Sequence, residues 1–244
     1  MGGGRIMTTT NTLKKDKDVK TLLLKAVQNG QQALSEYESK LVVAAAGVPV
    51  TQEVLVHSRQ EAMDKAAMIG FPVVLKGSSP ALTHKTEMGM VLVNLKNKEE
   101  AAQAYDELMG KGIDLDGVLI QKMVKGNREF VIGLTRDPQF GPCVMFGIGG
   151  IFTEAMKDVS FRVAPLTEED AQEMISEIRA VKLLNAFRGE GAVNRDVLVN
   201  ALVGIGNLGM VYDEIAEIDI NPLIVTEGRP VAVDALVILK AQRS

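Results

Sequence analysis

The chain has 244 residues, 46% hydrophobic and 24% charged, with a formal net charge of −4 at pH 7, which indicates a globular protein with a sizeable core and excludes wholesale disorder. An acidic balance without a basic stripe argues against nucleic-acid binding, and the single cysteine, Cys143, excludes an internal disulfide and suits a reducing compartment. No apolar run reaches the roughly 18 residues that cross a bilayer and no secretory segment begins the chain, so we expect a soluble, cytoplasmic protein without membrane contacts.

The first half of the chain predicts a flexible tail followed by a compact α+β unit. Residues 1–18 are polar and glycine-rich, and we expect them to form the tail. Apolar spacing and capping residues predict helices over 19–27, 34–46, 58–70 and 97–110. Short β-branched runs predict strands over 49–56, 72–76 and 90–95. Together these segments define an expected N-terminal lobe over residues 19–120.

The second half is richer in strands. Apolar runs predict strands over 117–124, 128–135 and 142–149, followed by helices over 167–184 and 194–212. The chain closes with a predicted hairpin, whose strands cover 216–225 and 230–239. The simplest organisation is α/β in the mixed (α+β) sense: two lobes, with a hinge near residues 121–124 and a C-terminal lobe over 121–244.

The C-terminal hairpin gathers acidic side chains. The turn "TEGR" (226–229) has a glycine that supplies positive φ, so a two-residue loop is favoured. That loop places Asn221 directly opposite Asp234, on one face and with Cβ atoms about 5 Å apart. Glu217 and Asp219 share this face, because strand side chains alternate. Carboxylate and amide oxygens are ligands that Mg²⁺ prefers; the alternative is an ordinary polar strand face.

A lysine before a hydroxyl-rich loop is a second candidate feature. Lys76 ends the strand "FPVVLK" and is followed by Gly77 and Ser78. A point charge beside backbone N–H groups is a common way to hold a phosphate. By itself the pattern is weak, since a lysine at a strand end is more often solvated.

The glycine-rich segment 146–166 contains Arg162. Its glycines permit close backbone approach to a ligand, but it matches neither the dinucleotide-binding fingerprint nor the P-loop. Arg162 could clamp a phosphate through two parallel hydrogen bonds. It could equally pair at the surface with Asp158 or Glu154.

His84, in the loop "SSPALTHKTEMG", is one of two histidines. Zinc would need three or four N or S ligands, and two scattered histidines with one cysteine do not supply them. The sequence also lacks the G-x-S-x-G elbow of a hydrolase triad. Beside a phosphate site, a neutral imidazole can act as a nucleophile that carries a phosphoryl group. His57 is interpreted as a surface residue.

Three long segments then resemble one family. They are "FPVVLKGSSPALTHKTEMGMV", "DPQFGPCVMFGIGGIFTEAMKDVSFRVAPL" and "EIDINPLIV". In this order they resemble the ATP-grasp β subunits of ADP-forming acetyl-CoA synthetases, which are NDP-forming acyl-CoA synthetases related to succinyl-CoA synthetase. The resemblance covers about residues 30–240. One departure is Met88, which stands where the family usually has a glycine.

The resemblance implies an ATP-grasp fold that clamps ATP or ADP, together with Mg²⁺, between two α+β lobes. With the patterns above, it assigns nucleotide contacts to Lys76, Gly77, Ser78, Gln121, Met123, Val124, Glu129 and Glu154. The metal ligands would be Asn221, Asp234 and Asp219. Catalytic roles would fall to His84, Arg162 and Lys76, with His84 transiently phosphorylated.

The implied reaction is acyl-CoA + ADP + phosphate ⇌ carboxylic acid + ATP + CoA. The acyl phosphate would form on an α subunit that carries the CoA-binding domain, in an α2β2 or similar hetero-oligomer, and this chain would be the nucleotide-binding β subunit. Two alternatives remain: a non-catalytic ATP-grasp regulatory module and an ATP-grasp carboxylate–amine ligase. The intact Lys76, His84 and Glu129 argue against the first, and the His84 loop argues against the second.

Overall fold

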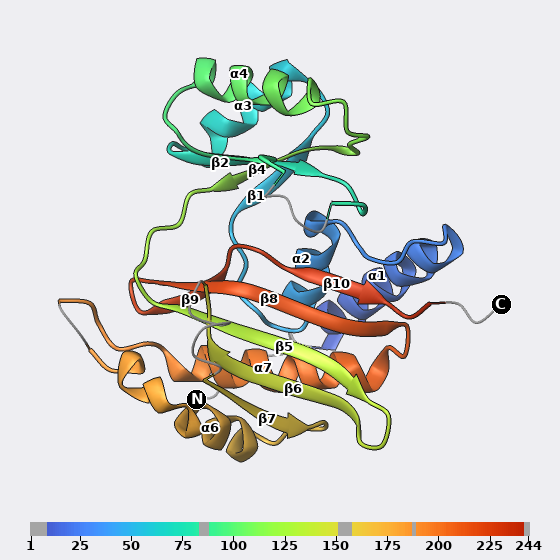
Figure 1. Ribbon diagram of the computed structural model, residues 1–244, viewed down its shortest axis with the longest axis vertical. Helices are drawn as coiled ribbons and strands as arrows, with labels where there is room; N and C mark the ends of the chain where they lie inside the picture. Colours follow the sequence, from blue (N-terminus) through green and yellow to red (C-terminus); the bar gives the residue numbers. More distant parts are fainter. Residues whose placement is uncertain (1–8, 83–87, 151–157, 187–188, 242–244) are drawn as a thin grey trace, which may run out of the picture.

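The structure is a computed structural model that describes residues 9–82, 88–150, 158–186 and 189–241 (Figure 1). The described residues form two antiparallel sheets in two lobes, which confirms the α+β class. The smaller sheet has the strand order β1-β4-β2-β3, and the larger has the order β10-β8-β5-β6-β7 with β9 paired to β8. Within this described part, no helix combines the length and apolarity that a membrane crossing needs.

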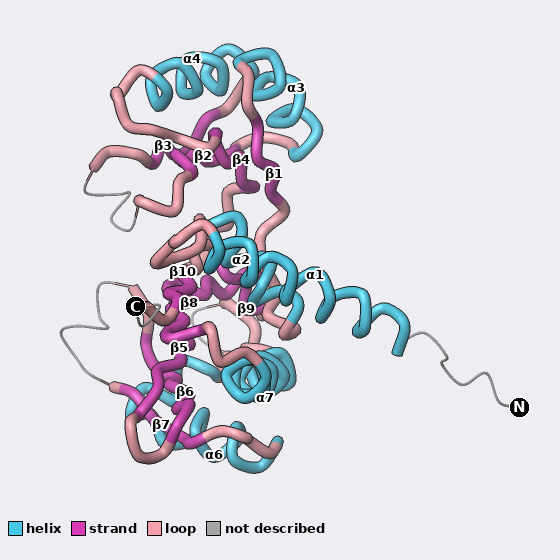
Figure 2. Tube along the Cα trace, turned by 90° about the vertical axis from the view of Figure 1, so that its right-hand side faces the viewer, coloured by secondary structure: helices cyan, strands magenta, loops and turns pink. Residues whose placement is uncertain are grey.

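The small lobe is a sheet covered on its outer face by two helices (Figure 2). Its strands are β1 (Glu53–Val56), β2 (Val73–Ser78), β3 (Val91–Leu95) and β4 (Gly117–Lys122), and its helices are α3 (Arg59–Ile69) and α4 (Lys98–Met109). Alternate residues such as Leu75 and Ile120 are fully buried against these helices. Because strand side chains alternate, their neighbours Lys76, Ser78 and Gln121 face the other lobe.

The large lobe contains the second sheet and the remaining helices. Its strands are β5 (Glu129–Asp137), β6 (Gly141–Ile148), β7 (Val159–Val163), β8 (Ile215–Thr226), β9 (Arg229–Ala232) and β10 (Leu236–Leu239). Its helices are α1 (Thr9–Gln28), α2 (Glu36–Ala45), α6 (Glu168–Glu177), η1 (Arg179–Leu184) and α7 (Arg195–Val211). Helix α7 packs along β5 and β6, and its buried residues join one core with α1, α2 and α6.

The N-terminal helices correct the expected lobe boundaries. Helix α1 begins at Thr9, inside the segment expected to be a tail, and residues 9–18 contain neither glycine nor proline, the two residues that disfavour a helix most. Helix α2 contributes Val42 and Val43 to the core of the large lobe, and Ala33 forms a bridge with Ile238 in β10. Residues 19–50 therefore belong to the large lobe, and the small lobe covers about residues 53–122.

One predicted helix is broken, and one strand was missed. The segment expected to be a helix over 167–184 splits at Ile178, whose φ of −64° and ψ of 140° are extended. The carboxylate of Asp158 accepts hydrogen bonds from Arg179 N at 2.7 Å and Ala180 N at 2.8 Å, which start the second helical piece. Strand β7, which follows Asp158, was not predicted, although its sequence VSFRV alternates apolar and polar residues.

Candidate functional site

The C-terminal hairpin has the predicted register. Thr226 pairs with Arg229, and both turn residues between them have positive φ, 50° for Glu227 and 76° for Gly228. The same register continues past the end of β9, because Leu236 pairs with Asp219 and Val233 N donates to Pro222 O at 3.1 Å. Asn221 and Asp234 are therefore opposite each other, as the turn predicted.

The acidic face of this hairpin brings several carboxylates close together. Burial, the largest cause, and the neighbouring carboxylates of Glu217 and Asp234 together raise the pKa of Asp219 to about 6. A hollow of about 120 Å³ lies beside Asp219 and Glu217, over Gly133 of the neighbouring strand. A bound cation would relieve this repulsion, since opposite charge favours the ionised carboxylate.

Asn221 is oriented by the glycine-rich segment after β6. Gly150 N donates to Asn221 Oδ1 at 2.9 Å, and Gly149 N donates to Glu129 O at 2.9 Å. Gly150 has φ of 66°, and a Cβ on it would overlap the Glu129 carboxylate. The segment thus brings Glu129 and Asn221 together. Among the residues that the structure describes, no three His, Cys, Asp or Glu groups are near enough to hold a metal ion by themselves.

Lys76 crosses between the lobes. It is 7% exposed, and its Nζ donates to Glu36 Oε1 of α2 at 2.7 Å and to Val233 O at 2.8 Å. Val233 directly precedes Asp234, so the small-lobe lysine reaches the hairpin within one residue of a predicted metal ligand. Burial alone would lower the pKa of Lys76, but Glu36 and then Asp234 outweigh it and the pKa is raised. The lysine is therefore held as a cation.

Ser78 lies two residues from Lys76 on the same face of β2. It is 1% exposed, and its Oγ has no hydrogen-bond partner in the described part of the chain. A buried hydroxyl without a partner is costly, so this atom marks a place where a polar ligand oxygen would fit. Between the two residues, a Cβ on Gly77 would press on Met90 and Leu115 on the opposite face.

The predicted hinge is anchored at its start. Gln121 is 3% exposed, and its Oε1 accepts a hydrogen bond from Lys40 Nζ at 2.9 Å. Met123 N donates to Pro72 O at 3.2 Å, directly after β4 ends at Lys122. Val124 follows in the connection to β5 and is half-buried. Residues 121–124 therefore form a connection between the lobes, where the hinge was predicted.

Glu36, Lys40 and Glu53 form a buried charged cluster that the sequence analysis missed. Lys40 Nζ lies 2.9 Å from Glu36 Oε1 and 2.7 Å from Glu53 Oε2. Burial raises the pKa of Glu53, although Lys40 opposes this. The only sequence signal was the spacing of Glu36 and Lys40, four residues apart in a helix, which is far more common on solvated helix faces.

Arg162, which the resemblance assigned to the phosphate end, does not lie beside these residues in this structure. Arg162 pairs with Val144 in β6. Its neighbour Phe161 pairs with Met145, which pairs with Gly133, and Gly133 pairs with Asp219. Phe161 and Asp219 therefore lie on the same face of the sheet. Arg162 therefore points to the helix-covered face, opposite to Asp219. There its guanidinium contacts Glu177 at 2.5 Å and Glu173 at 3.3 Å, both in α6. This is surface pairing, with partners other than Asp158 and Glu154.

Two predicted residues cannot be placed. His84 and Glu154 both lie outside the described residues, as do residues 83–87 of the loop that contains His84. The described part of this loop ends at Leu82 and resumes at Met88, which is exposed.

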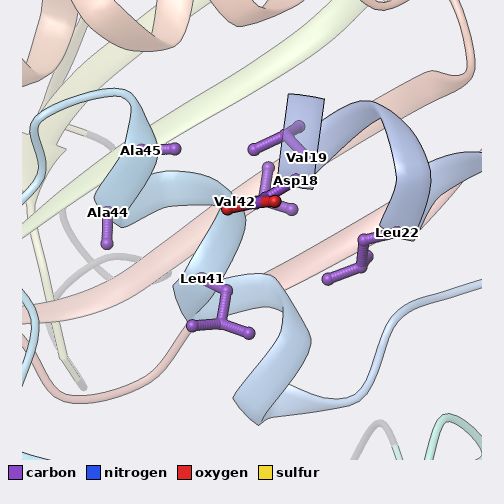
Figure 3. A pocket seen from close by; sticks show the side chains of 7 residues that line it. All are labelled: Asp18, Val19, Leu22, Leu41, Val42, Ala44 and Ala45. Carbon is purple, nitrogen blue, oxygen red and sulfur yellow. The ribbon is translucent and has the colours of Figure 1, made fainter. Parts of the chain in front are cut away.

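An apolar groove between α1 and α2 lacks the polar side chains that a catalytic or phosphate-binding site would need. It has a volume of about 320 Å³ and is lined mainly by aliphatic side chains (Figure 3): Asp18, Val19, Leu22, Leu41, Val42, Ala44 and Ala45. It contains none of the predicted site residues and only one ionisable group. The candidate site is therefore the interlobe face that carries Lys76, Ser78 and the acidic hairpin.

Comparisons with known proteins point to one family. Residues 25–239 match the family model of the ATP-grasp domain. Over 212 residues the chain is 46% identical to the β subunit of acetate–CoA ligase (ADP-forming) I from Pyrococcus furiosus, covering 84% of this chain and 91% of that protein. It is 35% identical to acetate–CoA ligase (ADP-forming) I from Archaeoglobus fulgidus, covering 93% of this chain but 35% of that longer protein.

A solved structure gives the same picture. It is acetyl-coenzyme A synthetase 1 of Ca. Korarchaeum cryptofilum in complex with coenzyme A and Mg-AMPPCP, with a phosphohistidine segment pointing towards the nucleotide binding site. The similarity has a TM-score of 0.82 and 45% sequence identity, and it covers 91% of this chain and 100% of that one.

Proposed function

The chain belongs to the ATP-grasp β subunits of ADP-forming acetate–CoA ligases, and from this premise we propose that it binds the nucleotide in an ADP-forming acyl-CoA synthetase. The reaction is acyl-CoA + ADP + phosphate ⇌ carboxylic acid + ATP + CoA. The observation that carries the proposal is the contact of Lys76 with Val233 O. It joins the candidate phosphate-binding lysine to the candidate metal-binding hairpin across the two lobes.

Lys76 and Ser78 hold the phosphates in this proposal. An ammonium has three N–H donors, and two of those on Lys76 are engaged by Glu36 and Val233. The third is available to a phosphate oxygen, and the buried hydroxyl of Ser78 is a second donor on the same face. Gly77 keeps the backbone between them free of a side chain.

Mg²⁺ fits the opposite side of the phosphates. Mg²⁺ is usually held by one or two carboxylates, with substrate phosphates and water completing its shell. Asp234 and Asp219 supply the carboxylates and Asn221 supplies an amide oxygen, so a set of three acidic protein ligands is not required. When bound, the ion would neutralise charge on the phosphate oxygens.

The base of the nucleotide is assigned to the connection between the lobes. Backbone groups of Gln121, Met123 and Val124 would contact adenine, with Glu129 close by at the start of β5. The packing of Glu129 against Gly150 supports this, because Gly150 also donates to Asn221. One short segment would then link the base end to the metal end of the site.

His84 is the proposed phosphoryl carrier, and Glu154 is assigned to the phosphate end; both lie outside the described residues. In the direction of ATP synthesis, the N–P bond of phosphohistidine breaks as an oxygen of the ADP β-phosphate bonds to phosphorus. The imidazole leaves with the electron pair of the broken bond. The described residues contribute position and positive charge, which dominate phosphoryl transfer.

An α partner completes the enzyme in this proposal. The chain spans about a third of the Archaeoglobus fulgidus relative, and the Pyrococcus furiosus relative is named as a β subunit. The remaining activities, which include binding of CoA and formation of the acyl phosphate, would reside in that partner. An α2β2 assembly is the proposed stoichiometry.

The test replaces each histidine in turn in the complex with the partner. His84→Ala should abolish ATP synthesis from acyl-CoA, ADP and phosphate, while ADP binding survives. His57→Ala is the matched control, since His57 is exposed and its Nδ1 lies 2.9 Å from Asp116 O. Full activity of His84→Ala would exclude the relay, and failure of the unchanged chain to bind ADP would exclude the nucleotide-binding function.

A further inference from the structure

The buried cluster of Glu36, Lys40 and Glu53 lies where the two lobes meet, yet the proposed function gives none of its members a role. Lys40 is 1% exposed and Glu36 is 2% exposed, and both belong to α2 of the large lobe. Glu53 belongs to β1 of the small lobe, and its side chain is 7% exposed. The cluster therefore connects the lobes through charges that water hardly reaches.

The ammonium of Lys40 is fully occupied inside the protein. It donates to Glu53 Oε2 at 2.7 Å and Gln121 Oε1 at 2.9 Å, and it lies 2.9 Å from Glu36 Oε1. Thr51 Oγ1 is a longer contact at 3.4 Å. Since an ammonium has three donors, Lys40 has none left for a ligand. It can act on a nucleotide only through its neighbours.

Those neighbours are the two ends of the candidate site. Glu36 Oε1 accepts from Lys76 at 2.7 Å while it lies 2.9 Å from Lys40, so one carboxylate oxygen holds both ammonium groups. Gln121, at the start of the connection between the lobes, is held by the same Lys40. A single buried lysine thus fixes one partner at the phosphate end and one at the base end.

Stability is a poor explanation for this cluster. Taking the three charged groups of the cluster out of water carries a large desolvation penalty, and buried ion pairs often contribute no more stability than well-packed apolar residues would. What such a cluster does provide is geometry, because each donor has a fixed acceptor. Here the cluster fixes the distance between the phosphate-binding lysine and the hinge.

We propose that Glu36 and Lys40 are positioning residues of the nucleotide site, Glu36 for Lys76 and Lys40 for both Lys76 and Gln121. The inference rests on the proposed nucleotide-binding function and adds to it. Glu36 directs the remaining N–H of Lys76 towards the phosphates. Lys40 keeps that lysine and the base-binding segment at a constant separation.

The first test separates the phosphate from the base. Glu36→Gln keeps the volume and an acceptor oxygen but removes the charge that holds Lys76. Its dissociation constant for ADP should rise about tenfold, the size of one lost charged contact. Its dissociation constant for adenosine, which has no phosphate, should stay unchanged. Calorimetry for ADP and ligand-detected NMR for adenosine give the two values, and Glu36→Asp should recover part of the ADP affinity.

The second test removes Lys40 together with one acid, so that no net charge is left buried. Lys40→Met with Glu53→Gln leaves the Lys76–Glu36 pair in place but frees Gln121. Affinity for adenosine should then fall, and affinity for ADP should fall by at least the same factor, because Lys40 also holds Glu36, the partner of Lys76. Met174→Ala is the control, because Met174 is fully buried in the large-lobe core. It should lower the melting temperature and leave both affinities unchanged.

Two outcomes overturn the inference while leaving the proposed function intact. One is an ADP affinity of Glu36→Gln equal to that of the unchanged chain, at a temperature where both are folded. The other is an equal loss of adenosine and ADP affinity in Glu36→Gln, which would indicate general disturbance of the site. If the unchanged chain binds no ADP, the proposed function itself fails.

Discussion

The two lobes face each other with opposite chemistry. The small lobe presents hydrogen-bond donors, Lys76 and Ser78, on alternate positions of one strand. The large lobe presents oxygen acceptors, Asp219, Asn221 and Asp234, along one hairpin. A polyphosphate bound between them would meet a protein cation on one side and would need a metal cation on the other. The contrast explains why the proposed nucleotide requires both lobes and Mg²⁺.

The two sides also differ in how their charges are balanced. Lys76 has a carboxylate partner in Glu36, so its charge is compensated before any ligand arrives. Asp219 has acidic neighbours, Glu217 and Asp234, and its pKa is raised to about 6. Lys76 is therefore held in place before a ligand binds, whereas the carboxylates around Asp219 repel one another. A substitution on one side should therefore leave the ligand binding of the other side unchanged.

Loss of Lys76 should have the largest effect. Lys76→Met removes the direct phosphate contact, and the dissociation constant for ADP should rise about 100-fold, because a charge-assisted hydrogen bond and its Coulombic support are both lost. The fold should survive, since Lys40 still pairs with Glu36. Calorimetry with ADP measures the change. Lys98→Met removes an exposed cation of the same lobe and should change nothing; equal losses in both variants would refute a local role.

The large-lobe side should show its effect through Mg²⁺. Asn221→Ala and Asp234→Ala should each weaken ADP binding about tenfold in the presence of Mg²⁺, but hardly at all in the presence of EDTA. Glu227→Gln, at the exposed turn of the same hairpin, is the matched control. An unchanged Mg²⁺ dependence in both alanine variants would show that the hairpin does not hold the ion.

Asp219 should link stability to pH in the chain without divalent cations. Its pKa of about 6 in the folded state lies above the ordinary aspartate value of 3.8, so the folded state favours the protonated form. The stability it contributes is present below pH 4 and is lost as the pH rises through 6. Asp219→Asn should therefore stabilise the chain by about 3 kcal/mol at pH 8 and by little at pH 4. Urea unfolding at the two pH values tests this, and equal gains at both would contradict it.

The hairpin shows what the sequence could predict. Its register follows from two residues with positive φ, and a turn of fixed length sets the pairs as far as Ile238, after which the register shifts. Asn221 was therefore placed opposite Asp234 without knowledge of the fold. Lys76 and Ser78 were likewise identified from one strand and its loop. Local backbone chemistry was sufficient to predict which residues lie together when they belong to the same hairpin or strand.

Contacts between segments that are distant in the sequence could not be predicted in this way. Helices α1 and α2 join the large lobe because their apolar faces complete its core, and nothing in their own pattern indicates which sheet they cover. The cluster around Lys40 joins residues up to 81 positions apart. Its members are charged, and charged residues are expected at the surface unless a partner is known. Only the packing of α2 between the lobes reveals these partners.

Arg162 should have the smallest effect, and it tests how the two faces of the large sheet differ. Strand β7 was not predicted, so the side to which Arg162 points was unknown from the sequence. Its ion pairs with Glu173 and Glu177 are at the surface, where such pairs contribute about 0 to 1 kcal/mol each. Arg162→Gln should therefore cost less than about 1 kcal/mol of stability and leave the dissociation constant for ADP unchanged. Glu177→Gln should behave alike, since it breaks the same pair from the other side. A clear loss of ADP affinity in Arg162→Gln, but not in Glu177→Gln, would indicate that Arg162 contacts the phosphates. Strand β7 would then have to present its other face when the nucleotide binds.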